Sequence, residues 1–413
     1  MPAPQFLVVK FRKDMYLLVE GKHAEECFFI IREGTVRISK QVQLKEEEKK
    51  SIIGPGNFIG IESAMSQRSQ IESAQVVSDE ALMLSVQRSQ FEDLIKYNSQ
   101  IAMKIIQQFS RRIRFLNSAL SRLSIKSGYK INDDDESLAL FRMGDFYQKL
   151  SMNQQAHYIF KRYVECYPKG DMVKEAYTKE KTLEKYYKPS YKTGENDFIR
   201  FYEEGSLIFA EGEFGRELYI ITKGLVKITK ILNGNEIIIA VLKQGDIFGE
   251  MAIIENKPRS AAAVALEDVT LMVVLKENFM LMSKTNPQII SRLTCILSER
   301  IWFSYKQLAI ALIRDPIGRA YNYLSLVLEK NNIEPRSGMS YAFDFGLAEL
   351  MKLVFVPVDQ HKEVSTGIIK NGVVTQLGGK LFTSDVEEIF KLGTYYKNKQ
   401  EREASQYRFK PGY

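Results

Sequence analysis

Cysteine and histidine are scarce in this sequence. Its 413 residues include three histidines and three cysteines, Cys27, Cys166 and Cys295. Cysteines so far apart exclude a disulfide framework and a cysteine-rich zinc site, and they make a reducing cytoplasm the simplest compartment. Three histidines leave little for histidine-based catalysis or metal binding. We therefore expect no metal site.

Long apolar runs are also absent. Residues 1–14 contain no apolar core followed by a small-residue cleavage site, so we expect no secretory leader. No run approaches the roughly 18 to 20 apolar residues that span a bilayer. We expect a soluble, cytoplasmic protein with no membrane partner.

Charge of one sign is in small excess. The net charge is +7, from 58 lysines and arginines against 51 aspartates and glutamates. This balance excludes a histone-like nucleic-acid binder but leaves room for a modest basic patch. Apolar residues make up 45% and charged residues 26%, which excludes wholesale disorder. At roughly 150 residues per domain, the length predicts two or three domains.

The sequence does contain an internal repeat. Residues 17–40 and 207–230 read alike, each with an apolar run, Glu-Gly, an aromatic-rich segment, a glycine and an alternating segment. Farther on, Gly60 and Gly249 end similar stretches and lie 189 positions apart. Short segments at hairpin spacing, joined by glycine turns, predict a small antiparallel barrel or jelly roll in each unit.

The second unit holds the residues that point to a ligand. They form two short stretches: Phe248, Gly249, Glu250, Met251 and Ala252, and then Arg259, Ser260 and Ala261. This spacing resembles the phosphate-binding cassette of cyclic-nucleotide-binding domains. The resemblance implies that these residues bind a cyclic nucleotide, with Arg259 on the cyclic phosphate and Glu250 on the ribose 2′-hydroxyl. It implies cyclic AMP as the default ligand, and Ser260 is also compatible with cyclic GMP.

The physical chemistry of these residue types suits that role. Gly249 lets a ligand approach the backbone, and a helical turn from Glu250 offers free N–H groups to a phosphate. The Arg259 guanidinium can bond an anionic phosphate as a fork. The alternative is an Arg259–Glu250 ion pair that only braces the loop.

The first unit keeps the turn but loses the charges. The 189-residue offset places Ile61 and Gln70 at the positions of the glutamate and the arginine. We therefore expect that this unit does not bind a cyclic nucleotide in the family's usual way. Arg68 or Glu62 could replace the missing charges only if the loop shifted.

A long amphipathic helix is expected after each unit, over residues 89–123 and 278–313. The second helix carries Trp302, the only tryptophan. The resemblance implies that its ring could stack on a purine base, whereas aromatic residues at helical spacing favour the alternative of packing in a core or a helix dimer. A long helix with an apolar face also predicts a homodimer.

Between the two units the sequence becomes helical. Residues 138–170 resemble a single tetratricopeptide repeat, and the positions that carry the resemblance are Gly144, Tyr147, Ala156, Phe160 and Pro168. Residues 172–187 would form a capping helix. Because one repeat cannot bury its own face, it must pack on a barrel, on a second chain or on a protein partner. A spacer and a peptide-binding surface both remain open.

The C-terminal part offers helices over residues 317–330, 343–350 and 357–371 and a hairpin over 373–382. In this order, behind a barrel and a long helix, they resemble the winged helix-turn-helix of transcription factors of the cyclic-AMP receptor protein/FNR class. The resemblance implies DNA binding.

The helix that would read DNA departs from that class. Gln360, His361 and Lys362 could contact bases or phosphates, but no arginine is present to grip guanine. Asp359 and Glu363 would face a polyanion poorly. A module for protein contacts is therefore the alternative.

We predict an α+β multidomain protein: two antiparallel β-jelly-roll barrels with flanking helices, a helical hairpin between them and a winged-helix-like C-terminal module. The expected bounds are 1–95 for a degenerate barrel, 96–130 for a connecting helix, 131–188 for the tetratricopeptide-like segment, 195–283 for the nucleotide-binding barrel, 284–314 for a long connecting or dimerisation helix, 315–390 for the winged-helix-like domain and 391–413 for a polar tail. Within that tail, we expect residues 395–413 to be a loosely ordered end.

The predicted function is a cytoplasmic cyclic-nucleotide-responsive regulator, most simply of transcription. Its expected partners are a cyclic nucleotide, DNA, a protein bound through the tetratricopeptide-like segment and a second copy of the chain. The alternative is a signalling scaffold with a vestigial or non-standard nucleotide site. No nucleophile–base pair, metal-ligand cluster or P-loop is present, so we do not expect an enzyme.

Overall fold

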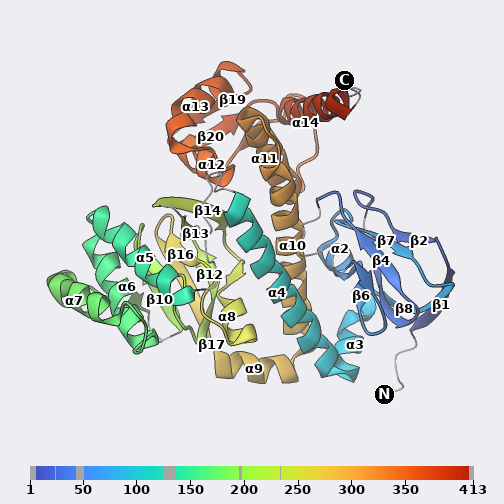
Figure 1. Cartoon of the computed structure of the whole chain (residues 1–413), viewed down its shortest axis with the longest axis horizontal. Helices are drawn as coiled ribbons and strands as arrows, with labels where there is room; N and C mark the ends of the chain where they lie inside the picture. The colour runs from blue at the N-terminus through green and yellow to red at the C-terminus, as the bar shows by residue number, and fades with distance from the viewer. Residues whose placement is uncertain are drawn as a thin grey trace, which may run out of the picture.

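Two β barrels flank a pair of long helices in the computed structural model (Figure 1). A helical segment covers the outer side of the second barrel, and a C-terminal module lies at one end of the helix pair. The structure describes residues 6–23, 25–42, 51–123, 135–194, 198–232 and 234–408. The acidic part of the expected linker, before residue 135, and the last five residues of the expected tail lie outside the described residues.

The first barrel consists of two four-stranded antiparallel sheets. One has the order β1 (Leu7–Arg12), β8 (Glu80–Gln87), β3 (Cys27–Glu33) and β6 (Phe58–Ile59), and the other β2 (Tyr16–Leu18), β7 (Ser73–Val76), β4 (Val36–Ser39) and β5 (Ile52–Ile53). A short helix, α2 (Ile61–Ser66), follows β6, and η1 (Arg88–Gln90) and α3 (Phe91–Tyr97) follow β8. Alternating apolar residues on β8 fill the interior, as the period of a strand requires.

The second barrel repeats this design. Its sheets have the orders β15 (Ile247–Phe248), β12 (Glu217–Lys223), β17 (Val269–Leu275), β10 (Ile199–Tyr202), β9 (Lys192–Thr193), and β11 (Leu207–Phe209), β16 (Ala262–Ala265), β13 (Val226–Leu232), β14 (Asn235–Leu242). α8 (Glu250–Glu255) follows β15, and α9 (Lys276–Thr285) follows β17. Both barrels carry the same register shift, between Ile31 and Glu33 and between Ile221 and Lys223. The predicted repeat of antiparallel sheet modules is confirmed.

Two long helices, α4 (Ser99–Leu123) and α10 (Pro287–Ala311), pack side by side between the barrels (Figure 1). Their buried apolar side chains form one continuous core, which includes Phe109, Ile113, Leu297 and Ile301. The apolar face that predicted a homodimer is therefore covered within one chain.

The helical segment between the barrels consists of α5 (Glu136–Lys149), α6 (Asn153–Cys166), α7 (Val173–Leu183) and η2 (Glu184–Tyr186). Its buried residues share a core with Leu207, Ala262 and Val264 of the second barrel. Of the three expected packing partners, a barrel of the same chain is the one observed. The tetratricopeptide assignment stays a prediction.

The C-terminal module has the element order α11 (Pro316–Lys330), β18 (Tyr341–Ala342), α12 (Leu347–Leu353), η3 (Val358–Gln360), α13 (His361–Lys370), β19 (Val374–Leu377), β20 (Lys380–Thr383) and α14 (Val386–Arg408). The three strands form one antiparallel sheet with β20 in the middle. This order agrees with the expected helices and hairpin, and the winged-helix assignment stays a prediction.

The expectation of a loosely ordered end is wrong for residues 395–408, because they belong to α14. Tyr396 stacks on Tyr321 of α11, with ring centres 6.4 Å apart. The Gly393 carbonyl accepts a hydrogen bond of 2.9 Å from the side chain of Asn322. Apolar residues at helical spacing within the polar sequence supply this contact face.

Within the part of the chain that the structure describes, no helix is long and apolar enough to cross a membrane. The same residues contain no group of three histidine, cysteine, aspartate or glutamate side chains placed to hold a metal ion.

Candidate functional site

The candidate site is built on the turn from β15 into α8. Gly249 has φ 78°, in the left-handed region, and serves as the N-cap of α8. A Cβ atom at this position would lie 2.6 Å from Arg259 Nη1. Glycine is therefore required because the arginine side chain passes directly over the turn.

Arg259 lies inside the barrel with 3% of its surface exposed. Nη2 donates a hydrogen bond of 2.7 Å to the Glu217 carbonyl, Nη1 donates to the Gly249 carbonyl, and the guanidinium lies 4.2 Å from the ring centre of Phe209. Nε has no hydrogen-bond partner, and no carboxylate among the described residues lies within 4 Å of the guanidinium. A buried cation without an opposite charge is expensive, and an anionic ligand would supply that charge.

Glu250, at the first position of α8, is 1% exposed. Its Oε1 atom accepts a hydrogen bond of 2.6 Å from Arg300 Nη1 on α10, while Oε2 has no partner in the described structure. The alternative of an Arg259–Glu250 brace is therefore not observed. The turn presents a buried acceptor with a free lone pair near a buried cation.

The first barrel keeps the backbone of this site. The Gln70 carbonyl accepts a hydrogen bond from the Gly21 N–H, and the Gln70 N–H donates to the Lys22 carbonyl, both at 2.8 Å. Arg259 makes the same two backbone bonds with Gly212 and Glu213, both at 2.9 Å. Gln70 thus occupies the backbone position of the arginine, as the 189-residue offset predicts.

Both barrels match one protein family. A family model described as "Cyclic nucleotide-binding domain" matches residues 8–98 and 199–286. Both barrels are cyclic nucleotide-binding domains. The prediction of two such barrels is confirmed.

Distant relatives extend the likeness over about half of the chain. The Cyclic AMP receptor protein of Thermus thermophilus is 29% identical over 177 residues, which cover 42% of this chain and 78% of that protein. A CRP-like cAMP-activated global transcriptional regulator of Mycobacterium tuberculosis is 24% identical over 189 residues, covering 46% of this chain and 84% of that protein. The structure of a CooA mutant from Carboxydothermus hydrogenoformans matches with a TM-score of 0.41 and 13% identity, over 49% of this chain and 88% of that chain.

The interior of the first cyclic nucleotide-binding domain is closed at the turn. Gly60 has φ 74°, as the matching glycine of the second domain has φ 78°. A Cβ atom at Gly60 would lie 2.8 Å from Leu18 Cδ1, whereas in the second domain the atom at that place belongs to Arg259. Gln70 is 2% exposed, and neither of its side-chain polar atoms has a partner among the described residues. An aliphatic side chain and a neutral amide have replaced the cation.

The two charged residues that could have substituted in the first domain are used elsewhere. Glu62 pairs with Arg112 of α4, and burial raises the pKa of Glu62 although Arg112 opposes that shift. Arg68 donates 2.7 Å to Glu299 of α10 and 2.6 Å to the Lys330 carbonyl at the end of α11. Arg68 thus ties the first domain to the helix that begins the C-terminal module.

In the second domain, both ends of α8 are tied to the long helix pair. At its start Glu250 holds Arg300 of α10. At its end the Glu255 carboxylate accepts 2.8 Å from Ser110 and lies 3.3 Å from Arg114, both on α4. A displacement of α8 therefore acts on both helices.

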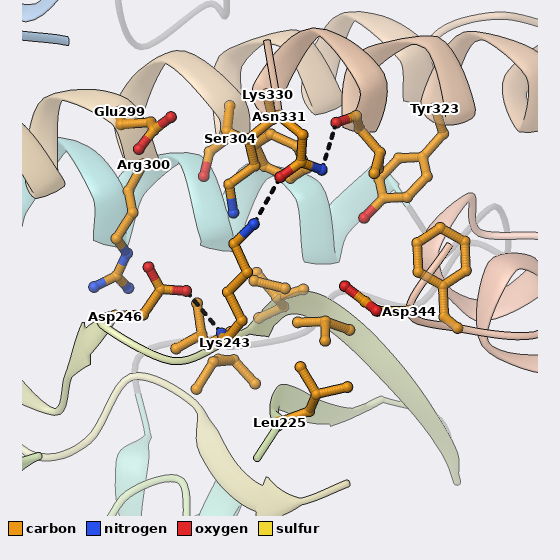
Figure 2. Close-up of a pocket in the computed structure, with 18 of the residues that line it drawn as sticks. Leu225, Lys243, Asp246, Glu299, Arg300, Ser304, Tyr323, Lys330, Asn331 and Asp344 are labelled. Atoms are coloured by element: carbon orange, nitrogen blue, oxygen red, sulfur yellow. Dashed lines mark hydrogen bonds between the residues drawn. The ribbon is translucent and has the colours of Figure 1, made fainter. Parts of the chain in front are cut away.

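Arg300 also lines a cavity of about 90 Å³ among the second domain, α4, α10 and the C-terminal module (Figure 2). Figure 2 shows Lys243 of the second domain donating to Asn331 beyond α11, a distance of 2.6 Å. Lys330 lies in the same cavity, and burial lowers its pKa. The arginine that holds Glu250 therefore borders the junction with the C-terminal module.

The other predicted cassette residues surround the turn. Phe248, Met251, Ala252 and Ala261 are buried, and Ser260 is half-buried next to Arg259. The Phe248 ring lies 5.2 Å from that of Tyr219, in the aromatic cluster under the arginine.

Of the two alternatives for Trp302, packing in a core is the one observed, and the base contact is not. Its side chain is fully buried, its Nε1 atom donates 3.3 Å to Ser69, and the Arg68 guanidinium lies 5.1 Å from its ring. Both partners belong to the first domain. Residues two apart on a helix point to opposite faces, so Trp302 turns away from the side that Arg300 reaches.

The three candidate DNA contacts lie together at the start of α13. Gln360 and Lys362 are exposed, whereas a ring nitrogen of His361 lies 2.9 Å from the Val356 carbonyl. The acidic neighbours Asp359 and Glu363 are exposed as well. The surface carries mixed charge, as its sequence suggests.

Sequence reasoning missed Phe209 and the pairing of Arg300 with Glu250. A signal for Phe209 exists, because it pairs with Ala263 in the sheet as Leu18 pairs with Ala74. Comparing the repeats would mark it as an aromatic residue particular to the second domain. No local signal links Arg300 to a turn fifty positions earlier.

Proposed function

We propose that the chain is a cyclic-nucleotide-responsive regulatory protein that binds one nucleotide, in its second cyclic nucleotide-binding domain. The observation that carries this proposal is the pair of buried unpartnered atoms, Arg259 Nε and Glu250 Oε2. A cyclic phosphate fits the first and a ribose hydroxyl the second. The names of the two bacterial relatives described above favour cyclic AMP, and Ser260 leaves cyclic GMP as the second candidate.

Binding would act through the ties on α8. A ribose hydroxyl that donates to Glu250 joins Arg300 on the same carboxylate, and a phosphate draws Arg259 from the carbonyls that now hold it. Both changes alter how α8 sits against α4 and α10. The ligand would then favour one placement of the C-terminal module over another, in proportion to its difference in affinity for the two.

The test is a calorimetric titration of the full chain with cyclic AMP and cyclic GMP. We expect micromolar or tighter binding of one of them with one site per chain, because the first domain lacks the arginine and has Leu18 in its place. Two equivalent sites would contradict the assignment to the second domain. No binding up to about a millimolar, near −4 kcal/mol, would remove the proposal.

For the output we propose transcription control through the C-terminal module, in a cytoplasmic, non-enzymatic and metal-free protein. The order of helices and strands and the name of the Mycobacterium relative support it. Gln360, His361 and Lys362 would contact the nucleic acid. The second candidate is a scaffold that binds proteins, and the exposed Asp359 and Glu363 favour it.

A mobility-shift experiment separates these outputs. With a pool of random-sequence duplexes, we expect shifts that strengthen with nucleotide and weaken with salt. Lys362→Ala should weaken the shift, and Lys370→Ala, on the other end of α13, is the matched control. Equal shifts for both variants and the parent, or none at all, would favour the scaffold.

We also expect a monomer in solution. The apolar face of α10 alone predicts a homodimer, but α4 covers that face within the chain. Light scattering after size exclusion should give the mass of one chain with and without nucleotide. The mass of two chains would show that another surface forms the dimer.

A further inference from the structure

The loop between β11 and β12, residues 210–216, holds Arg259 in place. The backbone N–H of Gly212 donates to the Arg259 carbonyl, and the Arg259 N–H donates to the Glu213 carbonyl, both at 2.9 Å. At Gly215 a side chain would collide with the Arg259 guanidinium. The position of this loop therefore sets where the arginine lies.

Helix α6 holds the loop from its other side. Tyr158 donates 2.9 Å to the Glu213 carboxylate. Arg162 donates 2.8 Å to the Phe214 carbonyl, and its Nε atom lies 3.4 Å from the same carboxylate. Two side chains, one helical turn apart, thus reach a single buried acid.

A third side chain, just after the end of α6, also contacts the loop. The Tyr167 hydroxyl donates 2.6 Å to the Gly212 carbonyl. Its ring lies 5.9 Å from that of Phe214, with the planes 43° apart. The helical segment therefore contacts the loop at Gly212, Glu213 and Phe214.

The buried acid is shared between the helix and the site. Glu213 is 4% exposed. Burial raises its pKa, and the positive charges of Arg162 on α6 and Arg259 in the barrel oppose that shift. Moving α6 away would leave Glu213 with less compensation, and the loop could then relax away from Arg259.

The described residues of the first domain lack this arrangement. Lys22 takes the place of Glu213, with the same backbone bonds, and is exposed. The neighbouring Glu20 instead accepts 2.9 Å from the Tyr305 hydroxyl of α10. Among the described residues, the contact of this loop with the segment α5–α7 is thus specific to the domain that keeps the arginine.

We propose that Tyr158 and Arg162 of α6 are positioning residues for Arg259, so that docking of the helical segment α5–α7 sets the affinity for the nucleotide. This rests on the proposed function of the second domain. Because coupling between two events is reciprocal, nucleotide binding tightens α6 on the barrel, and a protein that pulls α6 away releases the nucleotide.

The test compares nucleotide affinity in Tyr158→Phe and Arg162→Gln with the parent. We expect each variant to bind the nucleotide about tenfold more weakly and to release it faster. Tyr158→Phe loses the hydrogen bond to the buried Glu213 carboxylate, and Arg162→Gln loses its bond to the Phe214 carbonyl and its charge beside Glu213. Arg162→Lys should recover part of the affinity, since it keeps the charge but loses the fork. The matched control is Arg142→Gln, which removes an exposed charge from α5 and should bind within about twofold of the parent.

Hydrogen exchange gives a readout that a merely structural role would not move. Adding nucleotide should slow exchange of the α6 amides in the parent and not in Arg259→Ala. If both α6 variants melt at a lower temperature but bind like the parent, the residues only support the fold and the proposal is overturned. If the parent binds no cyclic nucleotide, the proposed function itself is wrong. If the parent binds and the α6 variants bind equally well, only the positioning role of Tyr158 and Arg162 is wrong.

Discussion

Replacing Arg259 by alanine should weaken cyclic-nucleotide binding at least about 100-fold, a loss near 2.8 kcal/mol. The Arg259 side chain is buried beside the turn from β15 into α8. Its Nε atom has no hydrogen-bond partner among the described residues. Without it a phosphate would enter a cluster of Phe209, Tyr219 and Phe248 rings and find no opposite charge. Calorimetric titration at constant ionic strength measures the loss.

Two controls make this result specific. Arg259→Lys keeps the charge and loses the fork, so we expect intermediate affinity. Gln70→Ala changes the matching position of the first domain and should leave affinity unchanged. Because Arg259 also bonds the carbonyls of Glu217 and Gly249, each variant must first show the circular dichroism spectrum of the parent. Unchanged affinity in folded Arg259→Ala would place the nucleotide elsewhere.

Trp302→Ala should lower the free energy of unfolding by about 3–5 kcal/mol. The indole is fully buried at the contact of α10 with the first domain, and removing it leaves a cavity there. It also leaves Ser69 without the donor at 3.3 Å and Arg68 without the ring that it covers. The effect should therefore concentrate on the attachment of the first domain.

Urea unfolding followed by circular dichroism measures this loss, since the variant has no tryptophan to report by fluorescence. Trp302→Phe keeps most of the volume and should cost less. Tyr177→Ala on α7 removes an aromatic residue that is 53% exposed, and it should change stability by no more than about 0.5 kcal/mol. A loss below about 1 kcal/mol in Trp302→Ala would mean that the interface repacks around the gap.

The repeat could be predicted from sequence because its signals are local. Turn glycines, alternating strands and an ungapped offset placed Gln70 at the backbone position of Arg259, and the hydrogen bonds agree. The residues of the turn itself were predicted from their resemblance to the phosphate-binding cassette of cyclic-nucleotide-binding domains. Local patterns follow from backbone geometry, which neighbouring residues determine.

The remaining contacts join distant parts of the chain. The amphipathic pattern of α10 showed that one face is apolar but not that α4 covers it. The pairing of Glu250 with Arg300 and that of Glu213 with Tyr158 each link two elements separated by many residues, and no spacing rule connects them. For the same reason the sequence of α14 predicts a tail, because its few apolar residues form a contact face only when they pack against Tyr321.

Because α4 and α10 belong to one chain, the two domains form a pair that differs from a symmetric dimer of identical chains. The effective concentration of one helix for the other is set by the connecting segment, so their pairing does not depend on how much protein a cell makes. In a symmetric pair every substitution enters both halves at once. In this chain the two domains can differ, so that Leu18 lies against the turn of the first and Arg259 against the turn of the second.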